Sequence, residues 1–146
     1  MELQLKPATP ALEQDWRELW ALYLAFYKTS KPEEVYAATW ARILDDTSPM
    51  YSVLAYADGK AVGLTNFLYH TSFWEVEDRC YLNDLYVRPD TRGLGAGEAL
   101  IQATVDHANT QGVDIVYWTT AGDNAVARGL YDKVARLTPF IKYQVP

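Results

Sequence analysis

The segment Arg92-Gly93-Leu94-Gly95-Ala96-Gly97 is the feature that most restricts how this 146-residue chain folds. It stands between a strand-like run at 80–88 and a helical pattern at about 95–110. Its glycines allow positive φ angles and a close approach of a ligand to the backbone. Free N–H groups at the start of the following helix attract anions such as phosphate. The segment predicts a phosphate-binding turn, and the alternative is a sharp connection with no ligand.

Two common nucleotide-binding loops do not match this turn. The Walker loop ends in Gly-Lys-Ser/Thr, whereas Gly97 is followed by Glu98 and Ala99. The dinucleotide fingerprint places its third glycine further along and follows the first strand, whereas this turn follows the fourth predicted strand. Neither nucleotide fold is therefore expected.

Strand and helix patterns alternate around the turn. We expect a short strand at residues 3–5, helices at 11–28 and 32–44, strands at 51–57 and 61–69 joined at Asp58-Gly59, a loop at 73–79, a strand at 80–88, a helix at 95–110 closed by Gly112, a strand at 115–119, a helix at 124–134 and a last strand at 138–145. The order β-α-α-β-β-β-α-β-α-β predicts one α/β domain over residues 1–146, with a mixed sheet flanked by helices.

Composition limits the classes of partner. Thirteen basic and 19 acidic residues give a net charge of −6, which argues against nucleic acid and is compatible with a cationic small molecule or with solubility alone. One cysteine and two histidines predict neither a disulfide framework nor a metal site. No apolar run approaches the ~18 residues of a membrane span, and the first ten residues do not resemble a signal peptide. We expect a cytoplasmic protein.

Two motifs resemble the GNAT superfamily of N-acetyltransferases. Leu85-Tyr86-Val87-Arg88-Pro89-x-x-Arg92-Gly93-x-Gly95-x-Gly97 is similar to its acetyl-CoA signature, Arg/Gln-x-x-Gly-x-Gly/Ala. Asn124-x-x-Ala127-x-x-Leu130-Tyr131 is similar to the helix that follows at the family's usual distance. Segments 81–87, 116–120 and 140–143 resemble a subgroup containing yeast acetyltransferases of histones, polyamines and D-amino acids. The resemblance implies the GNAT fold and transfer of acetyl from acetyl-CoA to a primary amine.

The resemblance also implies which residues bind coenzyme A. They are Leu85, Tyr86, Val87, Arg92, Gly93, Leu94, Gly95, Ala96, Gly97, Glu98, Asn124 and Tyr131. The pyrophosphate would lie against the N–H groups of the turn, with the Arg92 and Arg88 side chains as further positive charge. The backbone of 85–87 would bond the pantetheine arm and polarise the thioester carbonyl, whose oxygen gains negative charge in the transition state. Asn124 would cap the last helix and contact the pantetheine amides.

Two side chains are candidates for proton transfer. Tyr131 matches the family position near the acetyl sulfur, where a phenol of pKa about 10 would donate to a thiolate whose acid has a pKa of about 8.5. Asp84 is the candidate base, with a structural role as the alternative, because Asn83 stands where polyamine-acetylating relatives often carry the first of two carboxylates. Other candidate bases are His70, Glu75, Glu77 and Asp78.

The acceptor follows less directly from the sequence. Cys80 has no neighbouring histidine to activate it and is read as a small buried side chain, so direct attack of the amine in a ternary complex is expected. The aromatic and acidic segment 73–78 would border an acceptor channel, or else form a solvated loop with its rings in the core. We expect a small amine such as a polyamine or an amino acid. The alternatives are a protein lysine or a non-catalytic acyl-CoA-binding module. The apolar run 140–145 predicts a homodimer.

Overall fold

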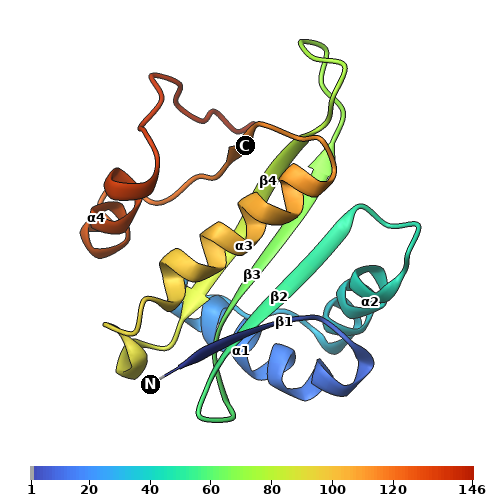
Figure 1. Cartoon of the computed structure of the whole chain (residues 1–146), viewed down its shortest axis with the longest axis vertical. Helices are drawn as coiled ribbons and strands as arrows, with labels where there is room; N and C mark the ends of the chain where they lie inside the picture. The colour runs from blue at the N-terminus through green and yellow to red at the C-terminus, as the bar shows by residue number, and fades with distance from the viewer. Residues whose placement is uncertain (1) are drawn as a thin grey trace.

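A computed structural model describes residues 2–146 as a five-stranded mixed sheet with helices on both faces (Figure 1). Its elements are β1 (Leu3–Pro7), a 3₁₀ turn (Pro10–Leu12), α1 (Glu13–Phe26), α2 (Glu33–Leu44), β2 (Met50–Ala57), β3 (Lys60–His70), β4 (Arg79–Val87), a second 3₁₀ turn (Pro89–Thr91), α3 (Ala96–Thr110), β5 (Val116–Tyr117) and α4 (Ala125–Val134). The strand order is β1-β2-β3-β4-β5, antiparallel except for the parallel pair β4–β5. The predicted mixed α/β fold is confirmed.

The sheet separates two apolar cores. Helix α3 covers one face, where Leu100 and Ala108 pack against buried strand residues such as Val62 and Phe67. Helices α1 and α2 cover the other face, where the indole rings of Trp16, Trp20 and Trp40 meet Leu54 and Leu64. Burial of these side chains is the main source of stability and fixes the sheet between the two helical layers. No helix among residues 2–146 combines the length and the apolar character that crossing a bilayer requires.

Local signals in the sequence produce the predicted turns and caps. Asp58 and Gly59 both have positive φ angles, 51° and 77°, as a tight two-residue hairpin turn requires. Gly112 follows Gln111, the C-cap residue of α3, and has a φ angle of 73°. The Asn124 side chain accepts a hydrogen bond from the Ala127 N–H and caps α4. These three predictions are confirmed, because each depends only on neighbouring residues.

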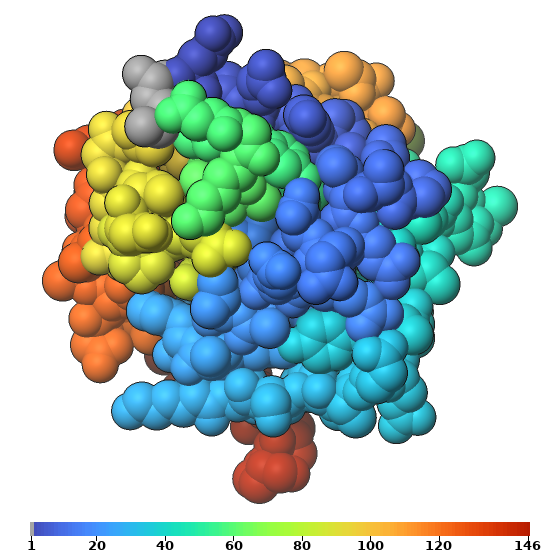
Figure 2. Space-filling model, turned by 90° about the horizontal axis from the view of Figure 1, so that it is seen from below, coloured from blue at the N-terminus to red at the C-terminus, as the bar shows by residue number. Residues whose placement is uncertain are grey.

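The predicted last strand at 138–145 is wrong. Residues 135–146 form neither helix nor strand, and Figure 2 shows the end of the chain, in red, projecting from the body of the molecule. Five apolar side chains of this segment are 77–88% exposed: Leu137, Phe140, Ile141, Tyr143 and Val145. A strand forms only where another strand supplies its hydrogen bonds, and β5, predicted over 115–119, pairs through Val116 and Tyr117 alone.

Gly63 on β3 permits the close contact that places the end of β4. A Cβ atom at this position would lie 2.6 Å from the backbone oxygen of Tyr86, which is well inside the van der Waals distance. Gly63 is paired with Val87, so a displacement at this point would move the segment 85–87. By contrast, a Cβ atom on Gly129 of α4 would meet no atom within 4 Å.

We expect opposite effects from the same substitution at these two glycines. Gly63→Ala should lower the free energy of unfolding by about 1–3 kcal/mol, because the added methyl group forces the backbone of β4 to move. Gly129→Ala should raise it by about 0.5–1 kcal/mol, because alanine restricts the unfolded chain and favours the helix. Equilibrium unfolding in urea measures both values, and a stable Gly63→Ala variant would contradict the close-contact argument.

Candidate active site

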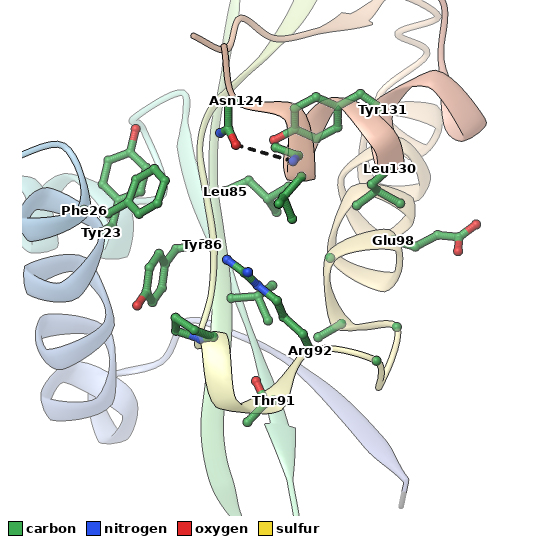
Figure 3. Close-up of a pocket in the computed structure, with 18 of the residues that line it drawn as sticks. Tyr23, Phe26, Leu85, Tyr86, Thr91, Arg92, Glu98, Asn124, Leu130 and Tyr131 are labelled. Atoms are coloured by element: carbon green, nitrogen blue, oxygen red, sulfur yellow. Dashed lines mark hydrogen bonds between the residues drawn. The ribbon is translucent and has the colours of Figure 1, made fainter. Parts of the chain in front are cut away.

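A cavity of about 490 Å³ lies between α1, β4, the glycine turn and α4 (Figure 3). Its lining includes every residue predicted to bind coenzyme A except Leu94, namely Leu85, Tyr86, Val87, Arg92, Gly93, Gly95, Ala96, Gly97, Glu98, Asn124 and Tyr131. The side chain of Leu94 instead packs against the core on the α3 side of the sheet. The fold thus gathers residues from 85 to 131 around one space.

Strand β4 separates from β5 next to this cavity. It pairs with β5 only through Cys80 and Tyr81, so among the described residues no strand lies along that edge beyond Tyr81. The backbone groups of 85–87 on this edge are therefore free to bond an extended ligand, which would add to the sheet like a further strand. The side chains alternate: Leu85 and Val87 pack towards α3, and Tyr86 towards α1.

The glycine turn has the geometry of an anion site. Gly93 and Gly95 have φ angles of 92° and 78°, and no heavy atom would lie within 4 Å of a Cβ at either, so the positive φ is what requires glycine. The first backbone bond of α3 runs from the Ala99 N–H to the Gly95 oxygen, which leaves the N–H groups of 96–98 without a helical acceptor. The Arg92 side chain extends into the cavity, and that of Glu98 points away from it (Figure 3).

Arg88 does not contribute charge to this anion site. Its Nε donates to the backbone oxygen of Ala61 at 2.9 Å, and its guanidinium lies 3.8 Å from the Glu18 carboxylate. These contacts hold the side chain against the β2–β3 turn and α1, outside the cavity lining. The expectation that Arg88 adds positive charge at the phosphates is wrong.

Tyr131 lies on the α4 side of the cavity, with its ring edge-on to Trp118 at 5.4 Å. Burial, followed by the nearby hydroxyl of Tyr27, raises the pKa of Tyr131 above that of an ordinary phenol. The hydroxyl therefore keeps its proton at neutral pH and is able to donate it. Asn124 lines the same side of the cavity and caps the helix that carries Tyr131.

Asp84 lies behind the cavity instead of lining it. The residue is only 9% exposed, and its carboxylate accepts hydrogen bonds from Trp20 Nε1 at 3.2 Å, Asn66 Nδ2 at 3.0 Å and Asn83 Nδ2 at 2.7 Å. Asn83 is the extra residue of a β-bulge, because Asn66 pairs with Asp84 and Phe67 with Leu82. The bulge brings the Asn83 side-chain amide to the Asp84 carboxylate. This bulge was not predicted from the sequence.

The other candidate bases lie away from the cavity. His70 bonds to the Tyr117 hydroxyl at 2.7 Å, and Glu75 forms an ion pair with Arg79 at 2.7 Å. Glu77 and Asp78 line a separate cavity of about 250 Å³ beside Tyr51 and Tyr69. The structure therefore does not bring these four side chains to Tyr131.

Segment 73–78 lies away from the large cavity, and the expectation that its rings lie in the core is wrong. It forms the loop between β3 and β4, at the end of the sheet opposite the glycine turn (Figure 1), and none of its residues lines the large cavity. Phe73 and Trp74 are exposed, and the Arg79 guanidinium lies over the Trp74 ring at 5.7 Å. The loop does not line the large cavity, and its two rings are not buried in the core.

The sequence did not predict that α1 contributes to the cavity. Tyr23 and Phe26 of α1 and its C-cap residue Tyr27 form a wall of the cavity. Their three- and four-residue spacing continues the apolar face of the helix, and the core behind the wall holds Trp16, Trp20 and Leu24. The sequence did contain a signal for this wall, because two tyrosines, Tyr23 and Tyr27, follow the buried tryptophans at the end of the helix.

Cys80 is fully buried and lies outside the cavity lining. Burial raises the pKa of its thiol to about 11, so the thiol is protonated at neutral pH and is a poor nucleophile. Within residues 2–146, no group of three histidine, cysteine or carboxylate side chains is arranged to hold a metal ion.

Comparisons with known proteins agree with this geometry. Residues 16–135 match the model of the acetyltransferase (GNAT) family. The chain is 38% identical over 142 residues to the D-amino-acid N-acetyltransferase HPA3 of Saccharomyces cerevisiae, covering 96% of this chain and 88% of that protein. It is 27% identical to a thialysine N-epsilon-acetyltransferase of Caenorhabditis elegans, covering 76% and 69%.

Solved structures show the same fold at low sequence identity. The aminoglycoside N-acetyltransferase AAC(6')-Iy with a bisubstrate analogue superposes with a TM-score of 0.87 at 18% identity, covering 100% of this chain and 99% of that chain. A ribosomal-protein-alanine N-acetyltransferase from Brucella melitensis has a TM-score of 0.79 at 20% identity, with 99% of each chain covered.

A mixed sheet that parts at β4, a glycine turn before α3 and a tyrosine on α4 together define an acyltransferase that uses coenzyme A thioesters. The chain belongs to the GNAT acetyltransferase family. It is an acetyl-CoA-dependent N-acetyltransferase that acts on amine substrates.

Gly95→Val tests the role of the glycine turn. We expect loss of coenzyme A binding, because a β-branched residue disfavours φ of 78° and would displace the N–H groups of the turn. Calorimetric titration with coenzyme A measures the effect, and Gly129→Ala serves as the control that should bind normally. Unchanged affinity for coenzyme A in a folded Gly95→Val variant would exclude the glycine turn as the phosphate-binding site.

Proposed function

We propose that this protein transfers acetyl from acetyl-CoA to the primary amine of a small metabolite, a polyamine or an amino acid, by direct attack in a ternary complex. The observation that carries the proposal is the free edge of β4 at 85–87, which lies between the anion site of the glycine turn and Tyr131. A linear ligand with phosphates at one end and a thioester at the other matches this arrangement.

The residues present fit coenzyme A. The N–H groups of 96–98 and the Arg92 side chain would hold the pyrophosphate. The backbone of 85–87 would bond the pantetheine arm, and Tyr131 would donate a proton to the departing thiolate. When bound, acetyl-CoA supplies the acetyl thioester that the amine attacks.

The relatives support a small acceptor. HPA3 is named for D-amino acids, the C. elegans relative for thialysine, and a relative in Nocardia farcinica, 34% identical over 88 residues, for L-2,4-diaminobutyric acid. Each of these compounds is a small molecule that carries a primary amine. The net charge of −6 favours a cationic acceptor over an acidic one.

The position of Cys80 supports direct attack. Its thiol is buried, protonated and outside the cavity, so an acetyl-cysteine intermediate would need a displaced strand. A cytoplasmic location and a single domain over 1–146 stay predictions.

A panel of amines tests the acceptor. We expect thiol release from acetyl-CoA, with a mass increase of the amine by one acetyl group, for spermidine, D- or L-amino acids or diamino acids. Their kcat/KM should exceed that of a lysine-rich histone-tail peptide. A preference for the peptide would favour a protein acetyltransferase. Binding of acetyl-CoA without turnover of any amine would favour a non-catalytic acyl-CoA-binding module.

Tyr131→Phe tests proton donation. We expect kcat to fall by about 10²–10⁴-fold, the range typical of a lost general acid. Acetyl-CoA binding should stay nearly intact, because the hydroxyl acts mainly when charge develops on the sulfur. Rapid-quench kinetics establish that chemistry limits the rate, and calorimetry establishes cofactor binding. An unaltered rate of the chemical step would exclude Tyr131 as the donor.

We also propose a homodimer formed through the C-terminal segment. Its apolar side chains are exposed, and within residues 2–146 no strand covers the outer edge of β5, so the segment of a second copy would gain both hydrogen bonds and burial there. Light scattering should give the mass of a dimer for the wild type and of a monomer for Ile141→Glu. If the wild type is a monomer with coenzyme A bound, the homodimer proposal is wrong.

A further inference from the structure

Helix α4 carries Tyr131 to the cavity without a buried face of its own. The helix lies at the edge of the molecule beside α3 (Figure 1), and none of its residues from Ala125 to Val134 is buried. Its Leu130 side chain reaches the start of α3, where a Cβ atom on Gly97 would lie 3.0 Å from Leu130 Cδ2. Helices in globular proteins are usually held by an apolar face on the core. The position of α4, and of Tyr131 with it, therefore depends on a few separate contacts.

The segment 118–120, which follows β5, supplies two of these contacts. The Asn124 side chain, which caps α4, donates from Nδ2 to the Thr120 hydroxyl at 3.4 Å. Further along the helix, the ring of Tyr131 packs edge-on to the indole of Trp118, with ring centroids 5.4 Å apart and planes inclined by 66°. The two contacts lie at different turns of α4 and together limit how the helix shifts or rotates.

The residue before this segment is fixed to the sheet. Tyr117 ends β5, and its ring stacks on that of Tyr81 of β4 at 5.1 Å, with an angle of 27° between the planes. The Tyr117 hydroxyl is hydrogen-bonded to His70 Nε2 of β3 at 2.7 Å. Trp118 therefore follows a side chain that two neighbouring strands hold in place.

The contact with Trp118 restricts the Tyr131 ring. Within residues 2–146, Trp118 supplies the only aromatic ring that packs on Tyr131, and both side chains are half-buried. Aromatic pairs favour an edge-to-face arrangement of this kind, so the indole opposes rotation of the phenol ring. Trp118 does not line the cavity, whereas Tyr131 does. The indole therefore acts on the cavity through Tyr131.

We propose that Trp118 is a positioning residue, which holds the Tyr131 hydroxyl in a fixed place relative to the edge of β4 at 85–87. The proposal rests on the proposed function and deepens it, because both the thioester and the proton donor would then be held by the same sheet. The thioester would lie along β4, and Trp118 would connect Tyr131 to β4 through Tyr117. A misplacement of about 1 Å can cost roughly 10²-fold in rate, so such a connection has a large effect.

Kinetics of Trp118→Leu and Trp118→Phe test this role. The leucine variant should lower kcat about tenfold or more, but no further than Tyr131→Phe does, because the indole acts through that hydroxyl. The KM of the amine and the affinity for coenzyme A should change little. Trp118→Phe keeps an aromatic ring and should restore most of the rate.

A double variant and a matched control complete the kinetic test. In the Tyr131→Phe background, Trp118→Leu should lower kcat by less than about twofold more, because the group that it positions is already lost. Trp74→Leu is the control, since this indole is exposed on the β3–β4 loop and should leave kcat unchanged. If Trp118→Leu does not fold, as judged by unfolding in urea, Trp118→Met repeats the test without a ring.

Fluorine NMR separates this proposal from the proposed function. Tyrosines are replaced by 3-fluorotyrosine, and the signal of residue 131 is assigned by its loss in Tyr131→Phe. This signal should move towards that of free fluorotyrosine in Trp118→Leu and stay near its original place in Trp118→Phe. Such a result supports the positioning role even if no amine is acetylated, which would overturn only the proposed function.

Three outcomes would overturn the positioning role while acetylation of amines stands. The first is an unchanged signal of residue 131 in Trp118→Leu. The second is an unchanged kcat in that variant, with chemistry shown to limit the rate. The third is a loss of kcat on Trp118→Leu that is equally large with and without the Tyr131 hydroxyl, because the indole would then act by another route.

Discussion

Strand β4 pairs with β5 through Cys80 and Tyr81 and continues to Val87, and beyond Tyr81 no described strand pairs with this edge. Because β3 still bonds its other edge, β4 keeps its strand conformation as far as Val87, where its free edge faces the cavity. A ligand at 85–87 therefore meets backbone groups that are already oriented, and the glycine turn follows within a few residues. The contact between Gly63 and Tyr86 supports the same segment from the side of β3.

A second constraint joins α1 to β4. The indole of Trp16 donates to Asn66 at 3.0 Å, Asn66 donates to Asp84, and Trp20 donates to the same carboxylate. Buried polar groups of this kind are stable only as a connected network, so the network fixes how far the last turn of α1 lies from the strand. The aromatic wall of the cavity depends on that distance.

The cavity thus has two chemically different ends. At the glycine turn, N–H groups and the Arg92 side chain face the cavity, whereas at the α1 end the cavity is lined by the rings of Tyr23, Phe26 and Tyr27. Tyr131, whose raised pKa keeps it protonated, lines the same cavity beside Asn124.

The sequence by itself determined the features that depend on neighbouring residues. The Asp58-Gly59 hairpin, the Asn124 cap, the positive φ of Gly112 after α3 and the glycine turn each follow from local backbone chemistry. Only the tertiary structure decided where long side chains point. Arg88 turns to Ala61 and Asp84 lies behind the cavity, because the hydrogen-bond partners of both come from distant elements. The last strand is absent for the same reason: its hydrogen bonds require a neighbouring strand, and residues 135–146 pair with none of the described strands.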